Sequence, residues 1–223
     1  MTNLDKYRTD RDKLRENLLK YTRKGYKFIP KIKHPNILDI GCGSGVPTIE
    51  LAKISNGHVT GIDIDESLLD ILRRKIKDAG LKNKVSVLNK SISTMSFEKE
   101  SFDIIWSEGA VFVIGFENSI KNWREYLIPN GFLVLHDDIK DKTKKLGLIE
   151  KYGYKLTAEF DLSFEIWWNE YYSQLEELVD KYKDKYPNDY ELTAEIDIDQ
   201  NQINMCKSNP EVVCSFYSIL KKL

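Results

Sequence analysis

The amino-acid sequence predicts an α/β fold in which helices cover both faces of a parallel sheet. Three observations carry this prediction. Short apolar strands alternate with helical segments between residues 36 and 138, a glycine-rich loop follows the first strand, and an aspartate ends the second. Such alternation forms βαβ units, which make the strands parallel and place the helices on the faces of the sheet. Because ligands bind these sheets beyond the carboxyl ends of the strands, we expect the functional site there.

Length and composition fit one domain with an appendage. The chain has 223 residues, 41% of them hydrophobic, which is enough to build a core of useful size. Its formal net charge of −1 provides no overall field that would attract nucleic acid. Three cysteines without repeated spacing, Cys42, Cys206 and Cys214, argue against a disulfide framework. The charged start does not resemble a signal peptide, and no apolar stretch could span a bilayer, so we expect a cytoplasmic protein without membrane contact.

The expected elements follow one another without a repeat or a flexible linker. An amphipathic helix is expected over residues 4–20. Five strands are expected at residues 36–40, 58–64, 84–89, 101–107 and 132–138. The helices between them are expected at residues 46–55, 65–80 and 116–131. Pro47 is tolerated in a first helical turn, and Pro129 and Gly131 are expected to end the last of these helices.

The pattern changes after residue 140. Alternating residues predict a strand over 153–163, and residues 211–222 are again typical of a strand. Between them, segments rich in aromatic and charged residues predict helices over 164–186 and 190–208. A helical insertion therefore separates the last two strands.

The glycine loop "GCGSG", residues 41–45, has the spacing G-x-G-x-G. Val46 stands where a dinucleotide-binding loop has its third glycine, and Pro47 removes an N–H group that a pyrophosphate would use. The loop contains no lysine, so it is not a phosphate-binding loop of the Walker type. A dinucleotide is therefore disfavoured, although the glycines could also serve only a tight turn.

Two aspartates indicate what the loop binds. Asp63 ends the second strand, 22 residues after Gly41, where a carboxylate can accept hydrogen bonds from two ribose hydroxyls. Asp39 lies within the expected binding edge, where it would repel phosphates and attract an ammonium group. A ligand with a ribose, an amino group and no phosphate is S-adenosylmethionine.

With these residues in view, the sequence resembles the class I S-adenosylmethionine-dependent methyltransferases. "LDIGCGSG" matches the glycine-rich motif of that family, "GIDID" its acidic second-strand end, and "FDIIWSEGAVFVIGF" with "YLIPNGFLVL" its fourth and fifth strands. The resemblance covers residues 30–162, and residues 211–222 fit the family's seventh, antiparallel strand. It is closest to the branch that includes quinone and sarcosine-type methyltransferases.

The resemblance implies a Rossmann-like, doubly wound, seven-stranded sheet, mostly parallel with an antiparallel last strand. Residues 1–223 would form a single methyltransferase domain. Its cofactor-binding core would comprise residues 30–162 and 210–223, with residues 1–29 and 163–209 forming a helical cap over the active site.

The resemblance also implies S-adenosylmethionine as cofactor, S-adenosylhomocysteine as product, and a set of binding residues. These are Asp39, Gly41, Gly43, Gly45, Asp63, Ile64, Ser91, Ile92, Trp106 and Ser107. The glycines would let the backbone approach the cofactor, Asp39 would hold its ammonium group, Asp63 would bind the ribose, and Ile64 would pack on the adenine.

The sequence departs from the family at the adenine contact. The family commonly has an aspartate after the third strand, where this chain reads "NKSIST", so Ser91 or Asn89 would have to take that place. Ile92 could offer its backbone N–H. Trp106 and Ser107 would line the floor near the methyl group.

The expected reaction is in-line transfer of the methyl group to a small-molecule acceptor. Glu108 and His136 close the fourth and fifth expected strands, so both are candidate catalytic residues that could orient or deprotonate an acceptor. Each could equally be a polar residue of the rim without a catalytic role. The identity of the acceptor, its methylated atom and the oligomeric state stay open.

Several alternatives remain at this point. Glu108, Asp137 and Asp138 could together hold Mg²⁺, but we expect no metal, since carboxylates near helix starts are also common capping residues. The chain could methylate RNA or protein, although "WSEG" stands where amino-methylating enzymes carry an N-P-P-Y-like motif. It could also bind the cofactor without transferring the methyl group, or be a nicotinamide-dependent oxidoreductase.

Overall fold

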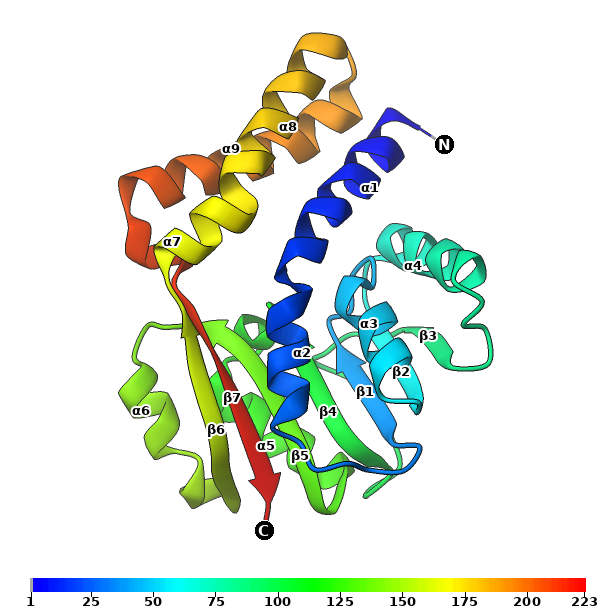
Figure 1. Cartoon of the computed structure of the whole chain (residues 1–223), viewed down its shortest axis with the longest axis vertical. Helices are drawn as coiled ribbons and strands as arrows, with labels where there is room; N and C mark the ends of the chain where they lie inside the picture. Colours follow the sequence, from blue (N-terminus) through cyan, green and yellow to red (C-terminus); the bar gives the residue numbers. More distant parts are fainter. Residues whose placement is uncertain (1) are drawn as a thin grey trace. The chain divides into compact units, whose positions relative to one another are not determined.

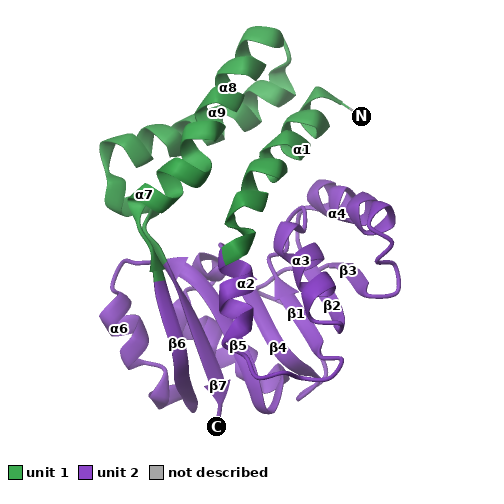
Figure 2. Ribbon diagram, in the orientation of Figure 1, with its two compact units in different colours: residues 1–20, 161–215 green, residues 21–160, 216–223 purple. Residues whose placement is uncertain are grey.

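The computed structural model describes residues 2–223. By its internal contacts the chain divides into two compact units, which Figure 2 colours separately. Unit 1 consists of residues 1–20 and 161–215, and unit 2 of residues 21–160 and 216–223. Residues 21–29, which the sequence analysis assigned to the cap, thus fall into the unit that contains most of the sheet.

A seven-stranded sheet organises unit 2. Its strands are β1 Asn36–Ile40, β2 His58–Asp63, β3 Val85–Asn89, β4 Phe102–Glu108, β5 Leu127–Asp138, β6 Tyr154–Leu162 and β7 Ser215–Lys222. They lie in the order β3-β2-β1-β4-β5-β7-β6, with β1 to β5 parallel and β7 antiparallel (Figure 1). The strand order reverses between β1 and β4, because β1 neighbours both β2 and β4. The expected fold class is confirmed.

Helices cover both faces of this sheet. In unit 2 they are α2 Leu19–Lys27, α3 Val46–Ile54, α4 Glu66–Asp78, α5 Phe116–Asn122 and α6 Lys142–Gly147. In Figure 1, α2 crosses in front of the sheet and α5 lies behind it. Since side chains alternate along a strand, Leu38 and Ile40 of β1 pack in the core cluster that contains Phe116 and Ile120 of α5. Asp39 faces the other side, towards α3.

The start of β5 differs from expectation. Helix α5 ends at Asn122, a 3₁₀ turn follows over Trp123–Tyr126, and Leu127 already pairs with Phe102 of β4. Pro129 and Gly131 therefore lie inside the strand and do not end the helix. Its register against β4 shifts between Phe102 and Ile104, and a proline without an N–H group fits such an irregularity.

The last strand is shorter than expected. Residues Pro210–Val213 form a 3₁₀ turn, and the strand begins at Ser215. The apolar pair at 212 and 213 carries the same strand preference as β7, but Pro210 opens a turn there.

Unit 1 is helical. It contains α1 Asn3–Arg15, a 3₁₀ turn at Glu16–Leu18, α7 Phe164–Trp167, a π-helical turn at Trp168–Tyr172, α8 Ser173–Lys185 and α9 Tyr190–Ser208. The helices expected over 164–186 and 190–208 are therefore confirmed. The helix expected over 4–20 is interrupted at the 3₁₀ turn, and its second part is the start of α2.

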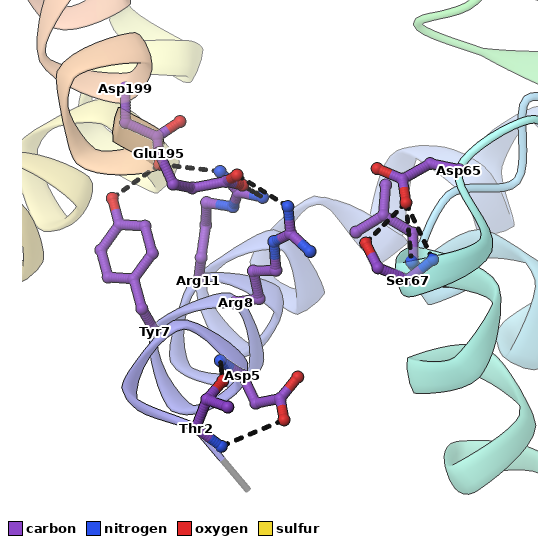
Figure 3. A network of polar contacts seen from close by, with 10 residues as sticks. Thr2, Asp5, Tyr7, Arg8, Arg11, Asp65, Ser67, Glu195 and Asp199 are labelled. Carbon is purple, nitrogen blue, oxygen red and sulfur yellow. Dashed lines mark hydrogen bonds and ion pairs between the residues drawn. The ribbon is translucent and has the colours of Figure 1, made fainter. Parts of the chain in front are cut away.

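A polar network joins α1 to α9 within unit 1 (Figure 3). The hydroxyl of Tyr7 donates to Asp199 at 2.6 Å, and Arg11 bridges Asp199 at 2.8 Å and Glu195 at 2.7 Å. Arg8 also pairs with Glu195, at 2.8 Å. Because Asp199 is buried, these partners offset the cost of removing its carboxylate from water.

Among residues 2–223, no helix is both long enough and apolar enough to cross a membrane.

Candidate functional site

The glycine loop follows β1 and leads into α3 at the sheet edge where the carboxyl ends of the strands lie. The backbone N–H groups of Gly41 and Cys42 both donate to the carbonyl of Ile62 on β2, at 2.9 Å each. All three glycines of the loop have a positive φ, between 51° and 80°. This left-handed conformation costs little only for glycine.

The three glycines are required for different reasons. A Cβ atom on Gly41 would lie 2.2 Å from Cβ of Ala110, and one on Gly45 would lie 2.1 Å from Cδ1 of Leu72. Packing within the protein therefore explains both. A Cβ atom on Gly43 would meet only Leu68, at 3.9 Å. Space remains beside the backbone at Gly43 alone.

Asp63 fastens this loop to the end of β2. One carboxylate oxygen accepts a hydrogen bond from the N–H of Gly43 at 2.8 Å, and the other accepts from the N–H of Asp65 at 3.0 Å. The cap of α4 is made by Asp65, which accepts from the N–H groups of Ser67 and Leu68. Asp63 therefore does not cap the helix, and its oxygens keep further acceptor capacity.

Asp39 is buried, with 2% of its surface exposed, and accepts a hydrogen bond from the hydroxyl of Thr48 at 2.6 Å. Burial raises the pKa of its carboxyl to about 7, the Thr48 bond opposes this rise, and the charges of Glu108 and Asp63 add to it. Three carboxylates from β1, β2 and β4 thus act on one another at this edge. Such a set favours a cationic partner.

The residues expected to contact the adenine ring lie in a part of the site that is more exposed to solvent than Asp39. Ile64 exposes 70% of its surface directly after β2. The amide of Asn89 donates to Glu66 at 2.7 Å and to the carbonyl of Ile64 at 3.3 Å, so its donor group is already engaged. The hydroxyl of Ser91 accepts from the N–H of Ser93, and Ile92 packs against the core.

Trp106 and Ser107 on β4 are fully buried. The hydroxyl of Ser107 donates to the carbonyl of Ile40 at 3.0 Å. The Trp106 ring lies on the other face of the sheet, against α2. There, a Cβ atom added to Gly25 would lie only 3.2 Å from this ring. The two side chains therefore lie on different faces of the sheet, and a shared place on the floor of a site stays a prediction.

Glu108 ends β4 and is surrounded by hydrogen-bond donors. The indole N–H of Trp106 and the hydroxyl of Thr22 each donate to its Oε1 at 2.8 Å. Tyr217 of β7 also bonds to its carboxylate, and burial followed by this negative charge raises the pKa of Tyr217 well above its ordinary value. These three donors hold the Glu108 carboxylate in place.

His136 is the register partner of Glu108 on β5. Its ring stacks on Tyr217, with centroids 4.4 Å apart and an angle of 13° between the planes. Both expected catalytic side chains are thus brought together around one tyrosine.

Comparison with known proteins shows that part of the chain is similar to methyltransferases. Residues 37–131 match a family model described as a methyltransferase domain. A demethylmenaquinone methyltransferase of Listeria welshimeri is 31% identical over 111 residues, 49% of this chain and 43% of that protein. Methyltransferase GfsG of Streptomyces halstedii is 26% identical over 127 residues, 56% of this chain and 46% of that protein.

Residues 37–131 belong to the class I S-adenosylmethionine-dependent methyltransferases. The family expected from the sequence is confirmed, and with it the class of cofactor. The chain spans less than half the length of the relatives named above.

Solved structures extend the likeness in fold to most of the chain. An S-adenosylmethionine-dependent methyltransferase of Thiobacillus denitrificans, in complex with S-adenosylhomocysteine, has a TM-score of 0.73 at 18% identity, covering 93% of this chain and 91% of that one. The [4+2]-cyclase SpnF has the same TM-score at 13% identity, covering 91% and 80%. The shared fold of a methyltransferase and a cyclase shows that fold alone does not decide the reaction.

The carboxylates considered for Mg²⁺ are not gathered in this methyltransferase domain. Lys145 of α6 pairs with Asp137 at 2.7 Å and with Asp138 at 3.0 Å. Asp137 follows His136 and points to the opposite face of the sheet from Glu108. Among the described residues, no group of three His, Cys, Asp or Glu side chains is placed to hold a metal ion.

Cys42 in the glycine loop is buried, and burial together with the nearby Asp39 and Asp63 raises the pKa of its thiol. A thiol held protonated in this way is a poor nucleophile. Its sulfur instead fills space beside β2, since a Cβ atom on Gly61 would lie 3.0 Å from it.

Sequence reasoning did not find Thr22 and Tyr217. Thr22 lies 86 residues before Glu108 and Tyr217 lies on the last strand, so no local pattern connects them to the site. A buried hydroxyl on an amphipathic helix was the only available signal.

Proposed function

We propose that this chain binds S-adenosylmethionine beyond β1 and β2 and transfers its methyl group to a small-molecule acceptor. The observation that carries this proposal is the set of carboxylates at Asp39, Asp63 and Glu108, next to a glycine loop without a lysine. S-adenosylmethionine carries a sulfonium and an ammonium group and no phosphate. Acidic groups suit it, whereas they would repel the phosphates of a dinucleotide.

The residues at the edge fit the parts of this cofactor. Asp63, which already orients the Gly43 N–H, has acceptor capacity left for ribose hydroxyls. Asp39 lies where it can attract the ammonium group, directly or through water. The exposed Ile64 offers an apolar surface to an adenine ring, and the backbone N–H of Ile92 would be a further contact.

The bound cofactor supplies an electrophilic methyl carbon. The chain's own residues have to exclude water and align the acceptor with the carbon–sulfur bond. Thr22, Trp106 and Tyr217 bond to the Glu108 carboxylate and hold it in place. Glu108 would orient a hydroxyl or amine of the acceptor.

We propose that residues 164–209 take part in binding the acceptor. Their helices carry Trp167 and Trp168, whose rings could exclude water. Hydrogen exchange would test this role. Cofactor and acceptor together should protect amides in residues 164–209, and unchanged exchange there would contradict it.

The acceptor is best sought with a pool of metabolites and S-adenosylmethionine labelled in its methyl group. A labelled small molecule would support the proposal and identify the acceptor. Label in RNA or protein would contradict the small-molecule assignment. Cofactor binding without any labelled product would favour a binding protein.

A further inference from the structure

A basic groove lies between α1 and α8, entirely within unit 1. It has a volume of about 300 Å³, and its walls include Lys6 and Lys13 from α1 and Lys181 and Lys185 from α8. All four lysines are exposed at their tips. The volume suits a small ligand or a single headgroup.

The spacing of these lysines brings like charges together. Lys181 and Lys185 are four residues apart on one helix, and Lys6 and Lys13 are seven apart on the other, so each pair lies on one helix face. The like charges of Lys181 and Lys185, four residues apart, destabilise α8. Only Lys13 is neutralised, by Asp10 at 2.7 Å. Within residues 2–223, Lys6, Lys181 and Lys185 form no ion pair.

Four other cations of unit 1 form ion pairs. Arg8 and Arg11 share Glu195, Lys20 pairs with Glu170 at 2.7 Å, and Lys207 pairs with Glu176. Unit 1 has more acidic than basic residues, so carboxylates are plentiful. The groove is thus a place where positive charge is concentrated in an acidic unit.

Two tyrosines give the groove a defined wall. Tyr182 is buried, and its hydroxyl donates to Asp10 at 2.9 Å, which fixes the only carboxylate of the groove against the wall. The Tyr186 ring is half-buried, and its centroid lies 5.8 Å from that of Tyr182. The ammonium groups of Lys181 and Lys185 lie over these two rings, 5.9 Å and 5.3 Å from their centroids, so the wall keeps both charges at the groove.

We propose that this groove binds a phosphate group, either of a small phosphorylated molecule or of a lipid headgroup. A phosphate offers several anionic oxygens to neighbouring ammonium donors and would relieve their mutual repulsion. The proposal is independent of methyl transfer, because every residue that carries it lies in unit 1.

The test is calorimetric titration of the full chain with pyrophosphate at low salt, together with sedimentation of the chain with phosphatidylglycerol vesicles. The double variant Lys181→Gln/Lys185→Gln removes two groove charges. A matched control, Lys77→Gln/Lys82→Gln, removes two exposed charges in and after α4. Circular dichroism melting verifies that both variants fold.

We expect binding in one of the two arms, weakened about tenfold or more in the groove variant and unchanged in the control. Binding of pyrophosphate identifies a soluble phosphate as the source, and binding of vesicles alone identifies a headgroup. Equal loss of binding in both double variants would show that binding depends only on the overall charge of the chain. That result would overturn the proposal. So would absence of binding in both arms.

Discussion

The indole N–H of Trp106 donates a hydrogen bond of 2.8 Å to the carboxylate of Glu108, two residues further along β4. Side chains two residues apart on a strand share a face, so this bond needs no change in the strand. Thr22 and Tyr217 add bonds from other elements. Together they hold the Glu108 carboxylate in one orientation.

Glu108→Gln should therefore lower kcat only modestly, by about tenfold or less, since the amide oxygen can still accept from Trp106. A general base predicts a loss on the order of 100-fold or more. Single-turnover kinetics over a range of pH separates these cases. A large loss that recovers at higher pH, with an acceptor that ionises, would show that Glu108 is a base.

Asp39 should make cofactor binding pH-dependent. Burial raises the pKa of its carboxyl from 3.8 to about 7, so below pH 7 most of the free protein carries Asp39 protonated. A bound ammonium group favours the carboxylate, so binding should release a proton and strengthen between about pH 6 and 7.5. Calorimetry in buffers of different ionisation enthalpy measures this release, and Asp39→Asn should abolish it.

The same raised pKa has a consequence for folding. Because the folded state holds the Asp39 proton to higher pH than the unfolded state, the carboxyl's contribution to stability is largest below about pH 4 and is lost as pH rises to about 7. Denaturation of wild type and Asp39→Asn across this window should therefore diverge as pH rises, the variant losing less. Parallel stability curves would contradict the raised pKa.

The glycines of the loop should respond differently to alanine. Gly41→Ala and Gly45→Ala should destabilise the fold, by clashes with Ala110 and Leu72 and by roughly 1–2 kcal/mol for the left-handed backbone. Gly43→Ala meets no such neighbour. It should lower the melting temperature least and weaken S-adenosylmethionine binding most. If Gly43→Ala binds the cofactor normally, the backbone at Gly43 does not approach it closely.

Much of this site could be predicted because its parts are local. The strand "NILDI", the glycine loop and Asp63 belong to one βαβ unit over residues 36–63, and their spacing along it defines their places.

What could not be predicted depends on tertiary packing. Glu108 and Asp137 point to opposite faces of the sheet because Glu108 pairs with His136 in the register of β4 and β5. The sequence alone does not show this register. Tyr217 reaches Glu108 only because β7 inserts between β5 and β6. Pro129 resembled a helix end, whereas the structure uses it at an irregular strand start.

Transfer should proceed without a divalent metal. Lys145 neutralises Asp137 and Asp138, and Glu108 is held by three protein donors, so none of these carboxylates is arranged for octahedral oxygen ligation. We expect full turnover in EDTA. If chelation abolishes turnover and Mg²⁺ restores it, these carboxylates must rearrange into a metal site and the metal-free account is wrong.

Titration of the chain with S-adenosylmethionine in a calorimeter, repeated with Asp63→Ala, tests the central claim most directly. The account predicts micromolar binding by the wild type. It predicts loss in the variant, because two charge-assisted hydrogen bonds to the ribose, about 1.5–3 kcal/mol each, disappear together with the anchor of the Gly43 N–H. Binding of NAD in place of S-adenosylmethionine, or full binding by Asp63→Ala, would contradict it.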